Sequence, residues 1–247
     1  MDKPIKEFYS RGEKSISKAI IECIESGYRP LSMPEIIDIK IDSSVQDKNW
    51  THECDSISLR VRGNGKASNI SHKGGTELVF ISHDYLHSQC DIVDRLKEYR
   101  LGKYGYGNMP PEDFQRLLQL EDGKMNFVMA REDLWPNGIY GIDTPTKKHM
   151  QEFGGKIDGV DMIAINHPEI RAFLTPERIE AYLKKHKTAF GLLGNDIAIV
   201  DYDDRPVMPA CRLLKTAGYF SVGYLGFTGS ESVENPLKIR RFVGLRE

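Results

Sequence analysis

Cysteine is scarce in this chain: there are four among 247 residues, and no two of them form a CxxC pair. They stand far apart, at Cys23, Cys54, Cys90 and Cys211. This spacing speaks against a zinc ribbon and against a small disulfide-rich scaffold, because both need closely spaced cysteines. We expect reduced thiols, with two long-range disulfides as the alternative.

Long apolar runs and a strong net charge are also missing. No segment approaches the roughly 18 apolar residues of a membrane span. The N-terminus, MDKPIKEFYSRGEK, is polar and charged, unlike a secretory signal peptide. The formal net charge of -2 creates no overall positive field toward nucleic acid or an anionic membrane. We expect a soluble cytoplasmic protein with no membrane partner, and the charge disfavours a nucleic-acid partner.

Two helices are predicted near the N-terminus. Isoleucines at helical spacing indicate a helix over about residues 13–26, and Gly27 is a natural stop. Ser32 is the expected N-cap of the second helix, because Glu35 stands in the capping-box position and Pro34 is tolerated in a first turn. The β-branched residues at the end of this segment, Ile39 to Asp42, fit a helix or a strand.

Period-two patterns come next in the chain. Ile57, Leu59 and Val61 alternate with polar residues as in a half-buried strand. The turn at 63–65 contains Asn-Gly, which predicts a β-hairpin with a return strand over 66–71. Further strands are expected in the last fifth of the chain, at Ile197–Tyr202, Cys211–Leu214, Tyr219–Phe227 and Lys238–Leu245.

These patterns predict an α+β fold with one or more antiparallel sheets, several short helices and a β-rich C-terminal fifth. Antiparallel pairing is favoured because turn signals separate neighbouring strands. With no repeat or linker in the sequence, residues 1–247 are expected to form a single domain. A division near residue 155 is the alternative.

The stretch Thr76–Asp94 runs from an apolar strand into a helical pattern. On a continuous helix from Asp84, one stripe would hold zinc-type ligands, namely His83, His87, Cys90 and Asp94. The apolar side chains of that helix fall on the opposite side, so the stripe should face solvent. We therefore expect a metal site if another segment covers the stripe, and a solvated helix face otherwise. The apolar set is Tyr85, Leu86, Ile92, Val93, Leu96 and Tyr99.

An acidic cluster could complete such a site. Asp201 and Asp203 come directly after the apolar run Ile197–Val200, and hard divalent cations prefer carboxylate oxygens. The candidate metal set is therefore His83, His87, Asp201 and Asp203. The run resembles the opening motif of haloacid-dehalogenase-type phosphatases, but the rest of the chain is too short for that family's parallel sheet, so we do not assign it there. The alternative for this cluster is a β-turn.

The sequence supports two functional hypotheses. No GxSxG, HExxH or Rossmann glycine pattern occurs, which favours a binding or assembly protein without catalytic activity or cofactor. Its partner would be another protein or a second copy of the chain. The aromatic side chains that could contact it are Tyr104, Tyr106, Tyr219 and Tyr224. The alternative is a hydrolase that uses a divalent metal at the His/Asp set.

A short segment resembles a known family. Residues 27–35, GYRPLSMPE, resemble the GYRLPT-x-x-E segment of C-type-lectin-like and sulfatase-modifying-type domains. Those families also finish on a short strand, comparable with Arg241–Leu245 here. No functional residue is carried over from this resemblance.

Overall fold

The computed structural model describes residues 5–10, 16–51, 54–64, 77–88, 91–100, 106–120, 124–130, 156–157, 160–161, 168–190, 209–216 and 240–246. Within these ranges the strands are β1 (Ile5–Ser10), β2 (Arg29–Pro30), β3 (Cys54–Asn64), β4 (Glu77–Ser82), β5 (Tyr106–Asn108), β6 (Asn126–Ala130), β7 (Lys156–Ile157), β8 (Val160–Asp161), β9 (Ala210–Thr216) and β10 (Arg240–Leu245). The helices are α1 (Ile16–Glu25), α2 (Met33–Asp42), α3 (Lys48–Thr51), α4 (Tyr85–Ser88), α5 (Ile92–Glu98), α6 (Pro111–Leu117), α10 (Pro168–Leu174) and α11 (Ile179–Phe190).

Both predicted N-terminal helices are confirmed. Gly27 ends α1 with a φ of 76°, and the Tyr28 N–H donates to the Cys23 carbonyl across the turn. At the start of α2, the Ser32 N–H donates to Glu35 Oε2 at 2.8 Å, as the capping box requires. The ambiguous residues Ile39 to Asp42 are helical.

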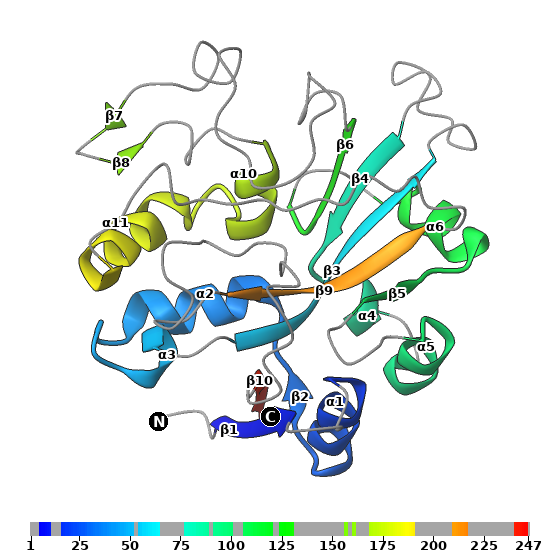
Figure 1. Ribbon diagram of the computed structural model, residues 1–247, viewed down its shortest axis with the longest axis horizontal. Helices are drawn as coiled ribbons and strands as arrows, with labels where there is room; N and C mark the ends of the chain where they lie inside the picture. The colour runs from blue at the N-terminus through cyan, green and yellow to red at the C-terminus, as the bar shows by residue number, and fades with distance from the viewer. Residues whose placement is uncertain are drawn as a thin grey trace, which may run out of the picture.

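Among the described residues, the main sheet has eight strands and is mixed. The path β1-β10-β3-β4-β6 is extended by β2 on β10, β9 on β3 and β5 on β9 (Figure 1). All these pairs are antiparallel except β10 with β3, which is parallel at Arg241↔Cys54. The α+β prediction is confirmed, but a purely antiparallel sheet was wrong. Turn signals reveal the direction only of strands that a turn joins, and β3 and β10 are far apart in the chain.

The predicted hairpin after β3 can be compared only over its first strand. β3 runs to Asn64 and pairs with β4 from Asn64↔Glu77 to Leu59↔Ser82. The predicted return strand, 66–71, lies outside the described residues. In the C-terminal fifth, β9 and β10 match two predicted strands, while the ranges 197–202 and 219–227 also lie outside the described part.

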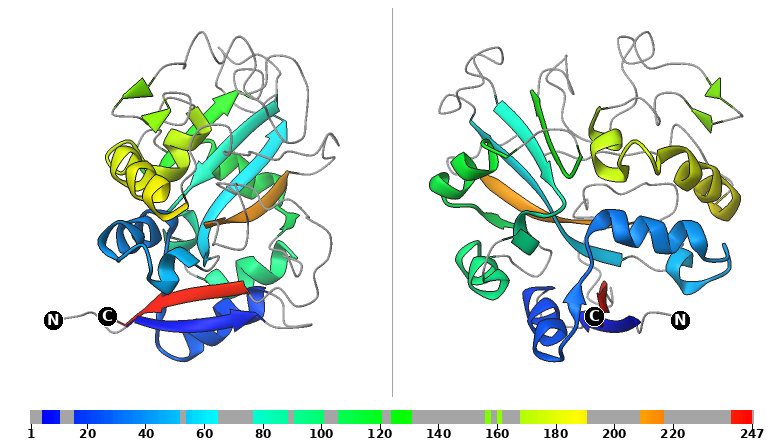
Figure 2. Two further views of the ribbon diagram at one scale, coloured as in Figure 1. Left: turned by 60° about the vertical axis from the view of Figure 1, so that its left-hand side comes forward. Right: turned by 180° about the vertical axis from the view of Figure 1, so that it is seen from behind.

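Helices cover both faces of the sheet (Figures 1 and 2). The alternation along β4 shows this, because Val79 and Ile81 join the core beneath α2, α10 and α11, whereas Leu78 and Phe80 join the core beneath α1, α4, α5 and α6. The polar positions of β3 are therefore also enclosed: Arg60 is only 3% exposed. Among the described residues, no helix is long and apolar enough to cross a membrane.

A close contact joins α1 to the last strand. A Cβ atom on Gly244 would lie 2.4 Å from Cys23 Sγ and 2.9 Å from Tyr28 Cβ. We expect Gly244→Ala to lower the free energy of unfolding by about 1–3 kcal/mol, because overpacking must displace α1 or β10. Urea denaturation measures this change. Adding Cys23→Ala should recover part of the loss, whereas equal stability of Gly244→Ala and wild type would contradict the tight packing.

Candidate functional site

His83 does not lie on a solvent-facing helix stripe. The helical pattern is interrupted: α4 ends at Ser88, and Asp91 caps a new helix, α5. His83 precedes both helices and is 1% exposed. The apolar side of the prediction holds for four residues, since Tyr85, Leu86, Leu96 and Tyr99 are buried. The prediction that His83 lies on this stripe was wrong, because it assumed one continuous helix beginning beside His83.

The buried imidazole ties several elements together. Its Nε2 lies 2.7 Å from the carbonyl oxygen of Ala172, and its Nδ1 lies 2.9 Å from Ser58 Oγ. A carbonyl only accepts, so Nε2 carries the proton and Nδ1 accepts from the Ser58 hydroxyl. Ser58 Oγ in turn accepts from the Met33 N–H at 2.8 Å. Burial lowers the pKa of His83 to about 4, so the ring is neutral at pH 7.

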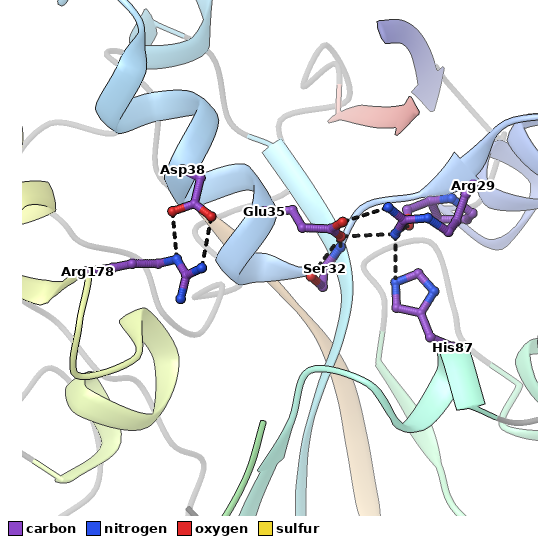
Figure 3. Close-up of polar contacts among 7 residues, drawn as sticks. Arg29, Ser32, Glu35, Asp38, His87 and Arg178 are labelled. Carbon is purple, nitrogen blue, oxygen red and sulfur yellow. Dashed lines mark hydrogen bonds and ion pairs between the residues drawn. The ribbon is translucent and has the colours of Figure 1, made fainter. Parts of the chain in front are cut away.

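His87 lies apart in a half-exposed polar group (Figure 3). Its Nε2 is 3.5 Å from Arg29 Nη1. The Arg29 guanidinium binds Glu35 with both ends, at 2.7 and 3.1 Å. Burial alone would raise the pKa of Glu35, but the hydrogen bonds from Arg29 and Ser32 outweigh it and lower that pKa. The group therefore connects β2, α2 and α4 through a charged hydrogen-bond network.

A pocket opens beside this group, between the α1–β2 segment and helices α4 and α5. Its volume is about 560 Å³, within the range of small-molecule sites. Arg29, His87, Asp91 and Arg246 supply its charged and polar groups. Most of the remaining lining is apolar or aromatic: Ile24, Tyr28, Pro30, Leu86, Ile92 and Val93.

Sequence reasoning missed this pocket. Its walls come from residues within 24–30, 86–87, 91–93 and 246, and no motif connects them. A second ion pair in Figure 3 was missed for the same reason. The guanidinium of Arg178, just before α11, binds both carboxylate oxygens of Asp38 on α2, at 2.6 and 2.9 Å. Partners that are far apart in the chain leave no local signal.

Lys40 is an unusual buried amine that sequence reasoning also missed. It is 1% exposed, and its Nζ lies 5.1 Å from the centre of the Trp50 ring. Burial lowers the pKa of this lysine to about 7. The indole N–H of Trp50 donates to the Lys40 carbonyl at 2.7 Å. Such enclosure supports a structural role between α2 and α3 rather than attack on a substrate.

The structure describes only two residues of the predicted metal set. His83 is enclosed in the core, and His87 lies in the half-exposed group with Arg29. Asp201 and Asp203 lie outside the described residues, as does Cys90 of the predicted helix stripe. Asp94 is exposed on α5 and lies 3.5 Å from Lys97 Nζ. Within the described ranges, no three His, Cys, Asp or Glu residues are grouped to hold a metal ion. The metal site stays a prediction.

Metal binding through that set has a direct test. Because both His83 nitrogens are hydrogen-bonded, a metal would have to break the bond to Ser58. We therefore expect added Zn²⁺ or Mn²⁺ to leave the melting temperature of the protein unchanged. Stoichiometric metal in the purified protein that disappears in an Asp201→Asn/Asp203→Asn variant would contradict this expectation and support the metal site.

Comparison with known proteins points to one fold. No protein-family model matches the chain. A solved structure described as "Accommodation of massive sequence variation in Nanoarchaeota by the C-type lectin fold" is 27% identical, with a TM-score of 0.67 over 99% of both chains. The chain therefore shares the C-type lectin fold. This agrees with the resemblance seen in residues 27–35, which form the turn after α1, β2 and the start of α2.

A second similarity covers less of the chain. Over 124 residues, the chain is 26% identical to the large ribosomal subunit protein bL19 of Thermus thermophilus. The match spans 46% of this chain and 85% of that protein. The C-type lectin likeness spans nearly the whole chain, so it is the stronger guide to function.

Proposed function

We propose that this chain is a non-catalytic binding protein whose ligand is another protein. The observation that carries the proposal is the full-length likeness to a C-type lectin fold that accommodates massive sequence variation in its relative. A fold that accommodates such variation in a relative is suited to recognition. The bL19 similarity is to a protein of an assembled particle and also supports a binding role.

The described core is consistent with such a scaffold. Polar groups link its elements, such as the buried His83 with the Ala172 carbonyl and the partly exposed Arg178 with Asp38. Cys23, Cys54 and Cys211 are buried free thiols, so the alternative of two disulfides was wrong. Free thiols support a reducing compartment, and we propose that the protein acts in the cytoplasm.

The binding proposal is tested in two steps. The tagged full-length chain is first used to capture proteins from cells of its source organism. The captured protein is then purified, and its affinity for the chain is measured by titration calorimetry. We expect a saturable complex of fixed stoichiometry. Sedimentation velocity of the chain alone tests whether the partner is a second copy.

A matched pair of variants sharpens the result. Tyr219 and Tyr224 are predicted contact residues that lie outside the described part of the chain. We expect a Tyr219→Ala/Tyr224→Ala variant to weaken the complex at least tenfold while keeping its melting temperature, since an aromatic anchor at an interface is worth about 2 kcal/mol or more. The exposed Lys97→Ala is the control. Unchanged affinity of the tyrosine variant would remove these residues from the interface. Failure to form any protein complex would overturn the proposal.

A further inference from the structure

We propose that the pocket between α1–β2 and α4–α5 binds a small organic anion that carries an aromatic or aliphatic group. This inference does not depend on the proposed protein partner, because it concerns a separate and smaller site. Its basis is a combination of volume, apolar lining and cations at one place.

The apolar lining provides the first part of the site. A pocket of about 560 Å³ has room for a ligand of one or two rings. Ile24 and Ile92 pack against the main core cluster but stay partly exposed, and Leu86 is buried beneath the pocket. Tyr28 adds an aromatic ring, which favours contact with a flat apolar group.

Cations gather around that ring and select the charge of the ligand. The Arg246 guanidinium lies 5.9 Å from the centre of the Tyr28 ring, and Lys6 Nζ lies 5.4 Å from it. Both Arg246 and Lys6 are exposed. A carboxylate or sulfonate beside Tyr28 would therefore be attracted by the exposed positive charges of Arg246 and Lys6.

The other polar groups of the lining are held by hydrogen bonds and an ion pair. Arg29 is paired with Glu35, so its own charge is largely offset. Because Arg29 can only donate, His87 Nε2 faces it as an acceptor and the ring proton is on Nδ1. Asp91 is the acidic group of the lining, and its carboxylate accepts from the Asp94 N–H at 3.2 Å. The pocket thus places Arg246 as the main contact for an anion.

The probe for the test is 8-anilinonaphthalene-1-sulfonate, an aromatic anion whose fluorescence rises in apolar surroundings. N-phenyl-1-naphthylamine has a similar ring system without the sulfonate and is the uncharged comparison. We expect one equivalent of the anion to bind the native protein and the uncharged probe to bind roughly tenfold more weakly, as the loss of one charge-assisted contact implies. Near-ultraviolet circular dichroism verifies that the protein is folded in each sample.

Three variants assign the binding to this pocket. Arg246→Ala should weaken the anion roughly tenfold and leave the uncharged probe unchanged. Val93→Trp, which places a large side chain in the lining, should abolish binding of both probes. Lys97→Ala, an exposed cation of α5 outside the lining, should alter neither. Equal affinity for the two probes, or anion binding unaffected by Val93→Trp, would overturn the proposal. Naphthoate and an acidic aromatic peptide are also compared as competitors of the anionic probe. If the peptide displaces the probe at a lower concentration than naphthoate does, the proposal is overturned in favour of a peptide site.

Discussion

Asp113→Asn is expected to lower the free energy of unfolding by about 2–4 kcal/mol. The Asp113 carboxylate is fully buried at the first turn of α6. Its Oδ2 accepts from Arg95 Nη1 at 2.6 Å and from the Tyr99 hydroxyl at 2.9 Å, and its Oδ1 accepts from Arg116 Nη1 at 2.9 Å. The amide NH₂ of asparagine would face one of these N–H or O–H donors and could not accept its hydrogen bond. The substitution also removes the negative charge that balances the two guanidinium groups.

The expected loss stays below that of a fully enclosed ion pair, because Arg95 and Arg116 keep 24% and 55% of their side-chain surface exposed and can turn toward water. Urea denaturation measures the change. Glu98→Gln is the matched control, since Glu98 also pairs with Arg95, at 3.0 Å, but is exposed. We expect less than about 0.5 kcal/mol from the control. Equal stabilities of Asp113→Asn and wild type would show that the buried carboxylate does not hold α5 to α6.

Acidification should destabilise the fold through His83. The pKa of this imidazole is about 4 in the folded protein, against an ordinary value near 6.5. Between those values the unfolded chain binds a proton that the folded chain does not. The contribution of the neutral His83 to the free energy of unfolding is therefore complete above pH 6.5 and is lost as the pH falls through 4. This contribution is about 3 kcal/mol.

Free energies of unfolding at pH 7, 5.5 and 4 test this prediction. Glutamine at position 83 does not titrate, so His83→Gln should be less stable than wild type at pH 7 and should lose less stability on acidification. The difference between the two losses gives the effect of His83 alone, because the carboxylates titrate in both proteins. Parallel profiles for the two proteins down to pH 4 would contradict the buried neutral imidazole.

Local features were predictable where neighbouring residues decide the structure. Gly27 can take positive φ at little cost, so the end of α1 could be seen in the sequence. The capping box of Ser32 and Glu35 depends on residues three apart. The resemblance of residues 27–35 to C-type-lectin-like domains covers this same locally determined segment, and the full-length comparison agrees with it.

The candidate site was less predictable, because burial depends on what packs on the far side of an element. His83 has the residue type and spacing of a metal ligand, yet α10 brings the Ala172 carbonyl to its ring. Arg60 alternates with apolar neighbours like a solvent-facing residue, yet helices cover both faces of β3. The segment that contacts the His83 ring is 89 residues away from it in the chain.

The sequence by itself determined the α+β class, the two N-terminal helices with their caps, and the apolar sets of β3 and β4. These depend on backbone preference and on periodicity, which act over a few residues. Only the tertiary structure decided the parallel pairing of β10 with β3, the neutral buried state of His83, and the pocket that Arg246 lines. Each of these brings together segments far apart in the chain, and the free energy of such contacts depends on the packing of the whole core.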